Sequence, residues 1–183
     1  MRRLAAILFV TILALAAASC GDKKLDAAYD RQESDIEDLI SNLTRGIDDA
    51  TVEHNNGVTR VTVAHGDGEA LDENGAVAFY YAGYVVTGKT LSNSNLFATN
   101  YEVFANSARW ALTDSSSFEI ATVRLGEDDL VEGLRKGLPG VKGGDECYVL
   151  FSGKLGFGKK KTGNVPPNAA LAYHLWIKSV SND

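Results

Sequence analysis

The segment that decides the fold, Leu125–Phe151, reads LGEDDLVEGLRKGLPGVKGGDECYVLF. Within it, Asp128–Leu138 begins with acidic residues, which favour the positive end of a helix. Its apolar residues recur at helical spacing: Leu130, Val131, Leu134 and Leu138. Pro139-Gly140 ends this helix, and the apolar run Cys147–Ser152 follows as a strand. The segment therefore predicts one short helix followed by a β-strand.

Other short segments rich in β-branched and aromatic residues surround this stretch. They are Val58–Ala64, Val77–Val86, Phe118–Leu125 and Ala169–Val180. The first of them alternates valines with polar residues, which is typical of a strand with one buried face. Thr87-Gly88-Lys89 is predicted to turn the chain into a hairpin. Because the strands do not alternate with helices, the pattern predicts an α+β domain.

The N-terminus has the three parts of a secretory signal. Arg2 and Arg3 precede the uncharged run Leu4–Leu15, and small residues lead up to Cys20. This order is that of a bacterial lipobox, in which cleavage leaves Cys20 as the acylated first residue. The alternatives are an ordinary signal peptide before a chance cysteine, and a transmembrane helix, which is disfavoured because the run is shorter than ~20 residues. We therefore expect residues 1–19 to be a lipoprotein signal peptide and Cys20 to carry a lipid such as palmitate, which holds the protein on a membrane.

Residues 20–26 are expected to form the lipidated cysteine and a short polar tether. Ala27–Ile47 has apolar residues at helical spacing and a charged opposite face, which predicts an amphipathic helix. The helix either lies on the domain, which we favour, or pairs with a second copy of the chain. Residues 27–71 are thus expected to be an N-terminal helix and β extension, and residues 72–183 the main domain.

Composition and missing motifs exclude several classes of function. Loss of residues 1–19 removes two of the 18 basic residues and none of the 24 acidic ones, so the formal net charge changes from −6 to −8. Such an acidic chain argues against a nucleic-acid partner. The three histidines lie far apart and no HExxH, CxxC or phosphate-binding loop is present, so we expect no metal and no cofactor. With Cys20 lipidated, Cys147 has no disulfide partner and is expected to pack as a small apolar residue.

A series of short motifs follows in a characteristic order. It comprises FYYAG at 79–83, GK at 88–89, LGE at 125–127, LVEGL at 130–134, VKGG at 141–144, LGFG at 155–158 and VPPNA at 165–169. In this order the motifs resemble those of the FKBP-type peptidyl-prolyl cis-trans isomerases, over about Asp72–Val180. The resemblance implies a bent antiparallel β-sheet wrapped around a short α-helix, with a shallow apolar pocket between them.

The resemblance also implies which residues form the pocket. They are Tyr81, Leu91, Leu130, Val131, Leu134, Phe157, Val165 and Tyr173. The backbone N–H of Val131 is expected to bind the carbonyl of a ligand. The pocket would act on proline-containing polypeptides, whose Xaa-Pro isomers exchange in tens to hundreds of seconds without a catalyst. Because a twisted amide is less polar than a planar one, an apolar site favours the twisted state without a titrating group.

Three pocket positions depart from the family pattern. Ser92 follows Leu91 where most active members have Asp, Phe157 replaces a Tyr, and Ala121 stands near the position of a usual Phe. The loss of one hydrogen bond costs roughly 0.5–1.5 kcal/mol, and lost aromatic walls reduce apolar burial. These departures predict a weakened isomerase that binds macrolide inhibitors poorly.

Residues 93–117 replace what is a short bulge in the family and are expected to be an insertion. Its apolar residues are Phe97, Tyr101, Phe104 and Trp110. It is either a local elaboration, which we favour, or a lid or polypeptide-binding surface beside the pocket. Lys159–Lys161 is expected to be a solvated loop tip that could contact acidic partners.

The expected function is cis-trans isomerisation of prolyl bonds in exported polypeptides at the bacterial cell envelope, with chaperone-like holding of those polypeptides. The lipid is expected to anchor the protein to a membrane, with the outer membrane favoured. Two other classes of function stay open: a non-catalytic FKBP-like module that binds peptides, and a structural lipoprotein whose N-terminal helix mediates assembly.

Overall fold

The structure is a computed structural model that describes residues 2–110 and 118–183, with side chains from residue 23 onward. The chain divides into two compact units, residues 1–31 and 32–183. Helix α1 (Arg2–Leu43) supplies the first unit, and its end begins the second. The predicted helix thus ends at Leu43 rather than Ile47, and Gly46 adopts a left-handed φ of 78° in the turn that follows.

The predicted tether, residues 20–26, is helical and continuous with α1. The predicted signal peptide and Cys20 fall among the residues whose side chains are not described. Among the side chains that are described, no helix offers an apolar stretch long enough to cross a membrane.

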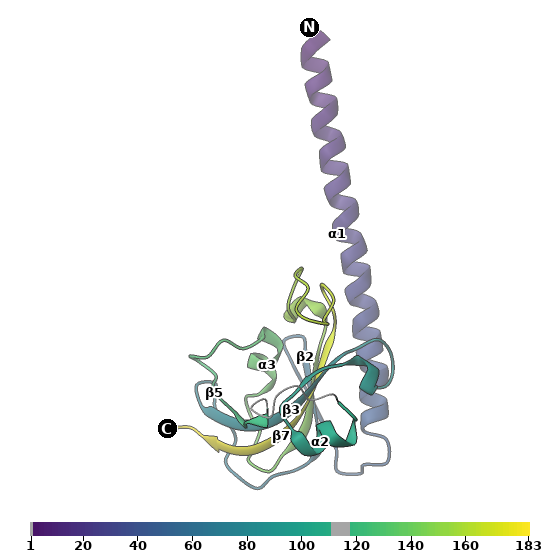
Figure 1. Cartoon of the computed structure of the whole chain (residues 1–183). Coiled ribbons are helices and arrows are strands. Elements are labelled where there is room, and N and C mark those ends of the chain that lie inside the picture. The colour runs from purple at the N-terminus through teal and green to yellow at the C-terminus, as the bar shows by residue number, and fades with distance from the viewer. Residues whose placement is uncertain (1, 111–117) are drawn as a thin grey trace. The chain divides into compact units, whose positions relative to one another are not determined.

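One antiparallel sheet forms the centre of the second unit (Figure 1). Its strand order is β1-β2-β6-β7-β3-β4, and β5 also pairs with β3. The strands are β1 (Thr51–Asn55), β2 (Val58–Ala64), β3 (Ala76–Val85), β4 (Leu96–Thr99), β5 (Ala121–Arg124), β6 (Glu146–Phe151) and β7 (Leu171–Ser181). The short helices are α2 (Glu102–Ser107), α3 (Glu132–Gly137) and the single 3-10 turns Asn93–Asn95 and Gly153–Leu155. The predicted α+β fold, with its antiparallel sheet and N-terminal helix, is confirmed.

Apolar side chains cover both faces of this sheet, because successive residues of a strand point to opposite sides. Val149 of β6 belongs to a buried cluster with Leu134 and Leu138 of α3 and its flank. Its neighbour Leu150 belongs to a second cluster, with Leu39 of α1. We call the two sides the α3 face and the α1 face. Since both faces are covered, the polar residues Thr59, Arg60 and Thr62 of β2 are buried as well.

The region between β3 and β5 differs most from the prediction. Thr87-Gly88-Lys89 does not form a tight hairpin, because β3 pairs with β7 as far as Val85 and β4 begins only at Leu96. The region expected as an insertion, residues 93–117, contains β4, which pairs with β3, and also α2. It is therefore partly a piece of the sheet itself. Its residues 111–117 lie outside the described residues.

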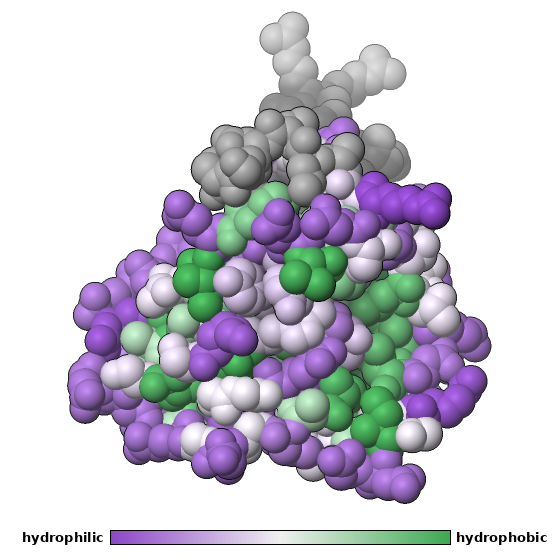
Figure 2. All heavy atoms as spheres, turned by 60° about the horizontal axis from the view of Figure 1, so that its bottom comes forward, coloured by the Kyte–Doolittle hydropathy of each residue, from purple (hydrophilic) through white to green (hydrophobic). Residues whose placement is uncertain are grey.

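The surface exposes few large apolar side chains. Figure 2 shows the side that lies at the bottom of Figure 1, where hydrophobic residues surface between hydrophilic ones. Over the described part of the chain, three large hydrophobic residues are exposed: Val52, Val103 and Ile120. Apolar side chains are thus concentrated in the two clusters and in one cavity on the α3 face.

Candidate functional site

Helix α3 lies directly on β6 because two of its residues are glycines. A Cβ atom at Gly133 would lie 2.3 Å from the ring of Phe151, and one at Gly137 would lie 2.4 Å from Val149. Such separations are too short for any side chain, so the backbone of the helix meets the sheet. Leu134, between the two glycines, is 5% exposed and joins the buried cluster of the α3 face.

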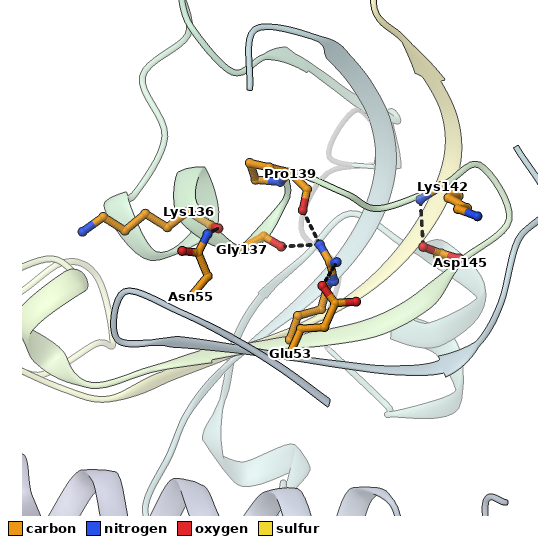
Figure 3. A network of polar contacts seen from close by, with 8 residues as sticks. Glu53, Asn55, Lys136, Gly137, Pro139, Lys142 and Asp145 are labelled. Atoms are coloured by element: carbon orange, nitrogen blue, oxygen red, sulfur yellow. Dashed lines mark hydrogen bonds and ion pairs between the residues drawn. The ribbon is translucent and has the colours of Figure 1, made fainter. Parts of the chain in front are cut away.

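The end of α3 is held by polar side chains from the β1–β2 hairpin (Figure 3). Arg60 Nη1 donates to the carbonyls of Gly137 at 3.1 Å and Pro139 at 2.5 Å. Asn55 Nδ2 donates to the carbonyl of Lys136 at 3.1 Å. The last carbonyls of a helix have no partner within the helix, so these side chains satisfy them and fix the position of α3.

A cavity of about 460 Å³ opens beside α3. Seven of the eight residues predicted for the pocket line it: Tyr81, Leu130, Val131, Leu134, Phe157, Val165 and Tyr173. The other residues that line it are Phe79, Phe97, Ala98, Ala121, Val123, Asp129, Thr162, Gly163 and Asn164. The lining comes from β3, β4, β5, β7, the start of α3 and the loop between β6 and β7. Segments far apart in sequence therefore meet at one apolar hollow.

The structure does not bring Leu91 to this cavity. Leu91 lies in the long β3–β4 connection and packs against the cluster of the α1 face. Phe97 of β4 lines the cavity instead. Gly83 pairs with Ala98 whereas Tyr84 pairs with Leu96, so Phe97 is the extra residue of a β-bulge. The residue after this pocket aromatic is Ala98, so an Asp is absent here as well.

Gly83 makes room for the Phe97 ring. A Cβ at residue 83 would lie 2.6 Å from that ring, which crosses β3 at this point. The ring meets Tyr173 and Phe157 edge-to-face, with centroids 5.8 and 6.2 Å apart. Gly83 and an aromatic residue shortly after it were the available sequence signals. These signals were not enough to identify Phe97, because the sequence motifs do not determine the length of the β3–β4 connection.

Two tyrosines, Tyr81 and Tyr173, add hydroxyl groups to the aromatic wall of the cavity. The ring of Tyr81 lies 6.3 Å from that of Phe79 and 6.1 Å from that of Tyr173. Burial raises the pKa of both tyrosine hydroxyls, because a phenolate would lose its hydration. Both therefore stay neutral at ordinary pH and can donate hydrogen bonds. Asp129 brings the one carboxylate among the described residues of the lining.

The chain just before α3 presents a backbone donor. Val131 has φ −56° and ψ 136°, so it is not yet helical, and its carbonyl accepts from the N–H groups of Leu134 and Arg135. Its own N–H has no hydrogen-bond partner within the described residues. The first N–H groups of a helix lack partners in the helix, and this one belongs to a residue that lines the cavity. It can bind a carbonyl oxygen.

The lining of the cavity includes no cysteine or histidine in the described part of the chain. No three His, Cys, Asp or Glu side chains are grouped there to hold a metal ion. Cys147 is fully buried in the core of the α3 face, as predicted. Burial raises its pKa to about 12, so it stays a thiol. The described lining of the cavity therefore offers apolar contact, hydrogen bonding and the carboxylate of Asp129.

The chain is similar to known proteins in sequence and in fold. The sequence model of the family described as FKBP-type peptidyl-prolyl cis-trans isomerase matches residues 68–178. Among curated protein sequences, none matches. FkpA from Escherichia coli is structurally similar, with a TM-score of 0.55 at 20% identity over 93% of this chain and 70% of that chain.

Two further solved structures show the same likeness. A peptidyl-prolyl cis-trans isomerase from Pseudomonas syringae pv. tomato has a TM-score of 0.56 at 17% identity, over 86% of this chain and 96% of that chain. The three FKBP domains of wheat FKBP73 have a TM-score of 0.58 at 18% identity, over 73% of this chain and 52% of that chain. At these identities the likeness shows a shared fold.

Proposed function

Because the chain belongs to the family of FKBP-type peptidyl-prolyl cis-trans isomerases, we propose that it isomerises Xaa-Pro bonds in exported polypeptides. The observation that carries this proposal is the cavity of about 460 Å³, walled by aromatic rings and bordered by the free N–H of Val131. This volume lies in the range of small-ligand sites.

The proposed mechanism needs binding and desolvation only. Rotation about a peptide bond has a barrier of ~18–20 kcal/mol, because resonance makes the bond planar and dipolar. Aromatic walls replace the water that stabilises the planar amide, while the N–H of Val131 holds a carbonyl of the bound segment. Rotation proceeds without transfer of a proton. Each 1.36 kcal/mol removed from the barrier increases the rate about tenfold.

We propose that the activity is weak for the family. Phe157 has no hydroxyl to donate to a bound carbonyl, Ala98 follows the pocket aromatic, and Ala121 leaves one side of the cavity without a ring. The same differences reduce contact with macrolide inhibitors. They support a reduced rate and a reduced inhibitor affinity.

The test is NMR exchange spectroscopy on a short Ala-Pro peptide mixed with the full purified chain. We expect faster cis-trans exchange, and a decrease of at least about tenfold in Leu134→Ala, which loses apolar contact at the cavity. Val103→Ala is the matched control, because Val103 is 68% exposed on α2. Peptide shifts without faster exchange would instead support the non-catalytic binding module.

We further propose that Cys20 is lipidated and holds the protein on a membrane of the bacterial envelope, the outer membrane being favoured. The lipobox order of residues 16–20 supports this. Labelled palmitate should enter the wild-type chain in cells and should not enter Cys20→Ala. Equal labelling of both chains would contradict the proposal.

A further inference from the structure

Two oppositely charged segments adjoin the lining of the cavity: Asp129 belongs to the lining, and Lys159–Lys161 come immediately before the lining residue Thr162. We propose that they select prolyl segments with oppositely charged flanks: acidic residues toward Lys159–Lys161 and basic residues toward Asp129. This inference rests on the proposed function, because it names the class of polypeptide that the same cavity takes. It follows from the position of each segment and from the lack of internal partners for its charges.

The basic segment leads directly into the lining of the cavity. Thr162, Gly163 and Asn164 line it. Backbone hydrogen bonds of 3.2 and 2.9 Å join Thr162 and Val165 in a tight turn. The exposed residues Lys159–Lys161 come immediately before this turn, in the loop between β6 and β7. An extended chain advances at most ~3.6 Å per residue, so the three lysines start within about 11 Å of Thr162.

These three lysines have no ion-pair partner within the described residues. Lys154, at the other end of the same loop, pairs with Glu33 at 3.0 Å. The charge of Lys154 is therefore paired with a carboxylate, whereas the charges of Lys159–Lys161 have no such partner within the described residues. This occurs on a chain whose formal net charge is −6, so the basic segment is a local exception to an acidic surface.

The acidic segment lies in the chain before α3. Asp129 lines the cavity, and Glu127 and Asp128 precede it at exposed positions. The Asp128 carboxylate accepts the backbone N–H of Arg124 at 2.7 Å, whereas Glu127 and Asp129 have no ion-pair partner within the described residues. The Arg135 guanidinium donates to the backbone carbonyl of Asp128 at 2.8 Å, but it forms no ion pair with Glu127 or Asp129 within the described residues, so these two carboxylates can meet cations from outside.

A polypeptide that fills the cavity passes close to both Asp129 and Thr162, because both line it. The Debye length is about 8 Å at physiological ionic strength. Charged residues that flank the bound proline therefore interact with charged side chains of the protein that lie within about that distance. An exposed ion pair is weak alone, but several pairs of the same sign on one side add to a preference for one orientation. Charge complementarity of this kind acts on specificity and on association rate.

The experiment uses two peptides of equal composition with Ala-Pro at the centre. One carries two Glu before and two Lys after it, and the other has the reverse order; a third carries Gln at all four positions. At low salt we expect kcat/KM for one of the two charged peptides to exceed kcat/KM for the other about five- to tenfold. The difference should largely disappear at about 1 M salt, where the Debye length is ~3 Å.

The variant K159Q/K160Q/K161Q should remove most of the difference and leave turnover of the Gln peptide unchanged. The matched control R45Q/K142Q/K178Q removes three exposed positive charges that lie outside the segment leading into Thr162–Val165, and should keep the difference. Equal rates for both charged orders at low salt, or a difference that survives in the lysine variant, would overturn the inference.

Failure of the proposed function gives a different result. If the wild-type chain does not accelerate exchange in the Gln peptide, the isomerase proposal fails. The Kd values of the two charged peptides, from NMR shifts, then test charge selection alone. Unequal Kd values that converge in the lysine variant would support it, and equal values would overturn it.

Discussion

The two faces of the sheet bury similar apolar residues, but one face is closely packed and the other contains a cavity. On the α1 face, Leu39 and its neighbours on α1 fill the space over β6 and β7, and Leu39 is 1% exposed. On the α3 face, a helix of six residues covers only part of the sheet, and Leu134 borders a cavity of about 460 Å³. Closed packing stabilises the fold, whereas incomplete packing leaves a binding site. The same type of residue should therefore affect stability on one face and activity on the other.

The largest expected effect comes from a matched pair of leucine substitutions. Leu39→Ala should lower the free energy of unfolding by about 3–5 kcal/mol, because it opens a hole in a closed core. Leu134→Ala should cost less stability, about 2–3 kcal/mol, because part of its surface already faces the cavity. The order should reverse in kcat/KM, with a loss of at least about tenfold for Leu134→Ala and little change for Leu39→Ala. Urea unfolding and NMR exchange measure the two quantities; parallel losses in both variants would remove the distinction between the faces.

The next effect concerns the polar anchor of the α3 face. Arg60→Ala should cost about 2–4 kcal/mol, because the carbonyls of Gly137 and Pro139 lose their donor while still partly shielded from water. Glu53, which accepts from Arg60 Nη2 at 2.6 Å, is 60% exposed and can be hydrated instead. Glu53→Gln should therefore cost under about 1 kcal/mol. Urea unfolding compares the two; a loss under about 1 kcal/mol in Arg60→Ala would show that α3 needs no polar anchor.

A smaller effect is expected from a substitution that adds a hydrogen-bond donor to the cavity of the α3 face. Phe157→Tyr introduces a hydroxyl at the cavity, where it can donate to a bound carbonyl. One added hydrogen bond of about 0.5–1.5 kcal/mol predicts a two- to tenfold rise in kcat/KM. Phe97→Tyr is the control, because it adds the same group to the ring that contacts Phe157 in the same wall of the cavity. If both variants or neither increased the rate, the departure at Phe157 would not explain a weak activity.

The second half of the chain could be predicted well because local contacts fix its spacing. Gly133 and Gly137 are required where α3 touches β6, so the motif around them determines both the helix and the residues beside it. The order of the motifs from residue 125 onward accordingly indicated Leu130, Val131 and Leu134, all of which line the cavity.

The first half was harder because its decisive features depend on tertiary structure. The spacing from Gly83 to the pocket aromatic depends on a long connection and a β-bulge, neither of which has a motif of its own. The alternation in Val58–Ala64 indicated a strand but gave no sign that Arg60 is buried. Arg60 is buried because the end of α3 lies beside β2. The residues next to Arg60 in the sequence do not indicate this contact.

The smallest effect belongs to a titrating pair on the α1 face. His174 Nε2 lies 2.7 Å from Glu146 Oε1, and the His174 ring stacks on Tyr148 and lies tilted against Trp176, with centroids 4.1 and 3.9 Å away. Burial lowers the pKa of His174, because an imidazolium would lose its hydration. The hydrogen bond from His174 lowers the pKa of Glu146. The pair thus favours a neutral imidazole that donates from Nε2 to a carboxylate.

The sign of the pH dependence follows from these two directions. Both groups have a lower pKa in the folded chain, so the unfolded chain binds more protons as the pH falls. The contribution of His174 is complete above about pH 6.5 and is lost as the pH falls through its folded pKa; that of Glu146 is lost below about pH 4.3. We expect a nearly constant free energy of unfolding from about pH 8 to 7 and a decline on acidification. His174→Gln, which keeps a donor for Glu146, should remove the first part of the decline. Since neither group lines the cavity, kcat/KM should be flat across that first step; a rate change that tracks it, or an unaltered decline in His174→Gln, would show that the two faces are coupled.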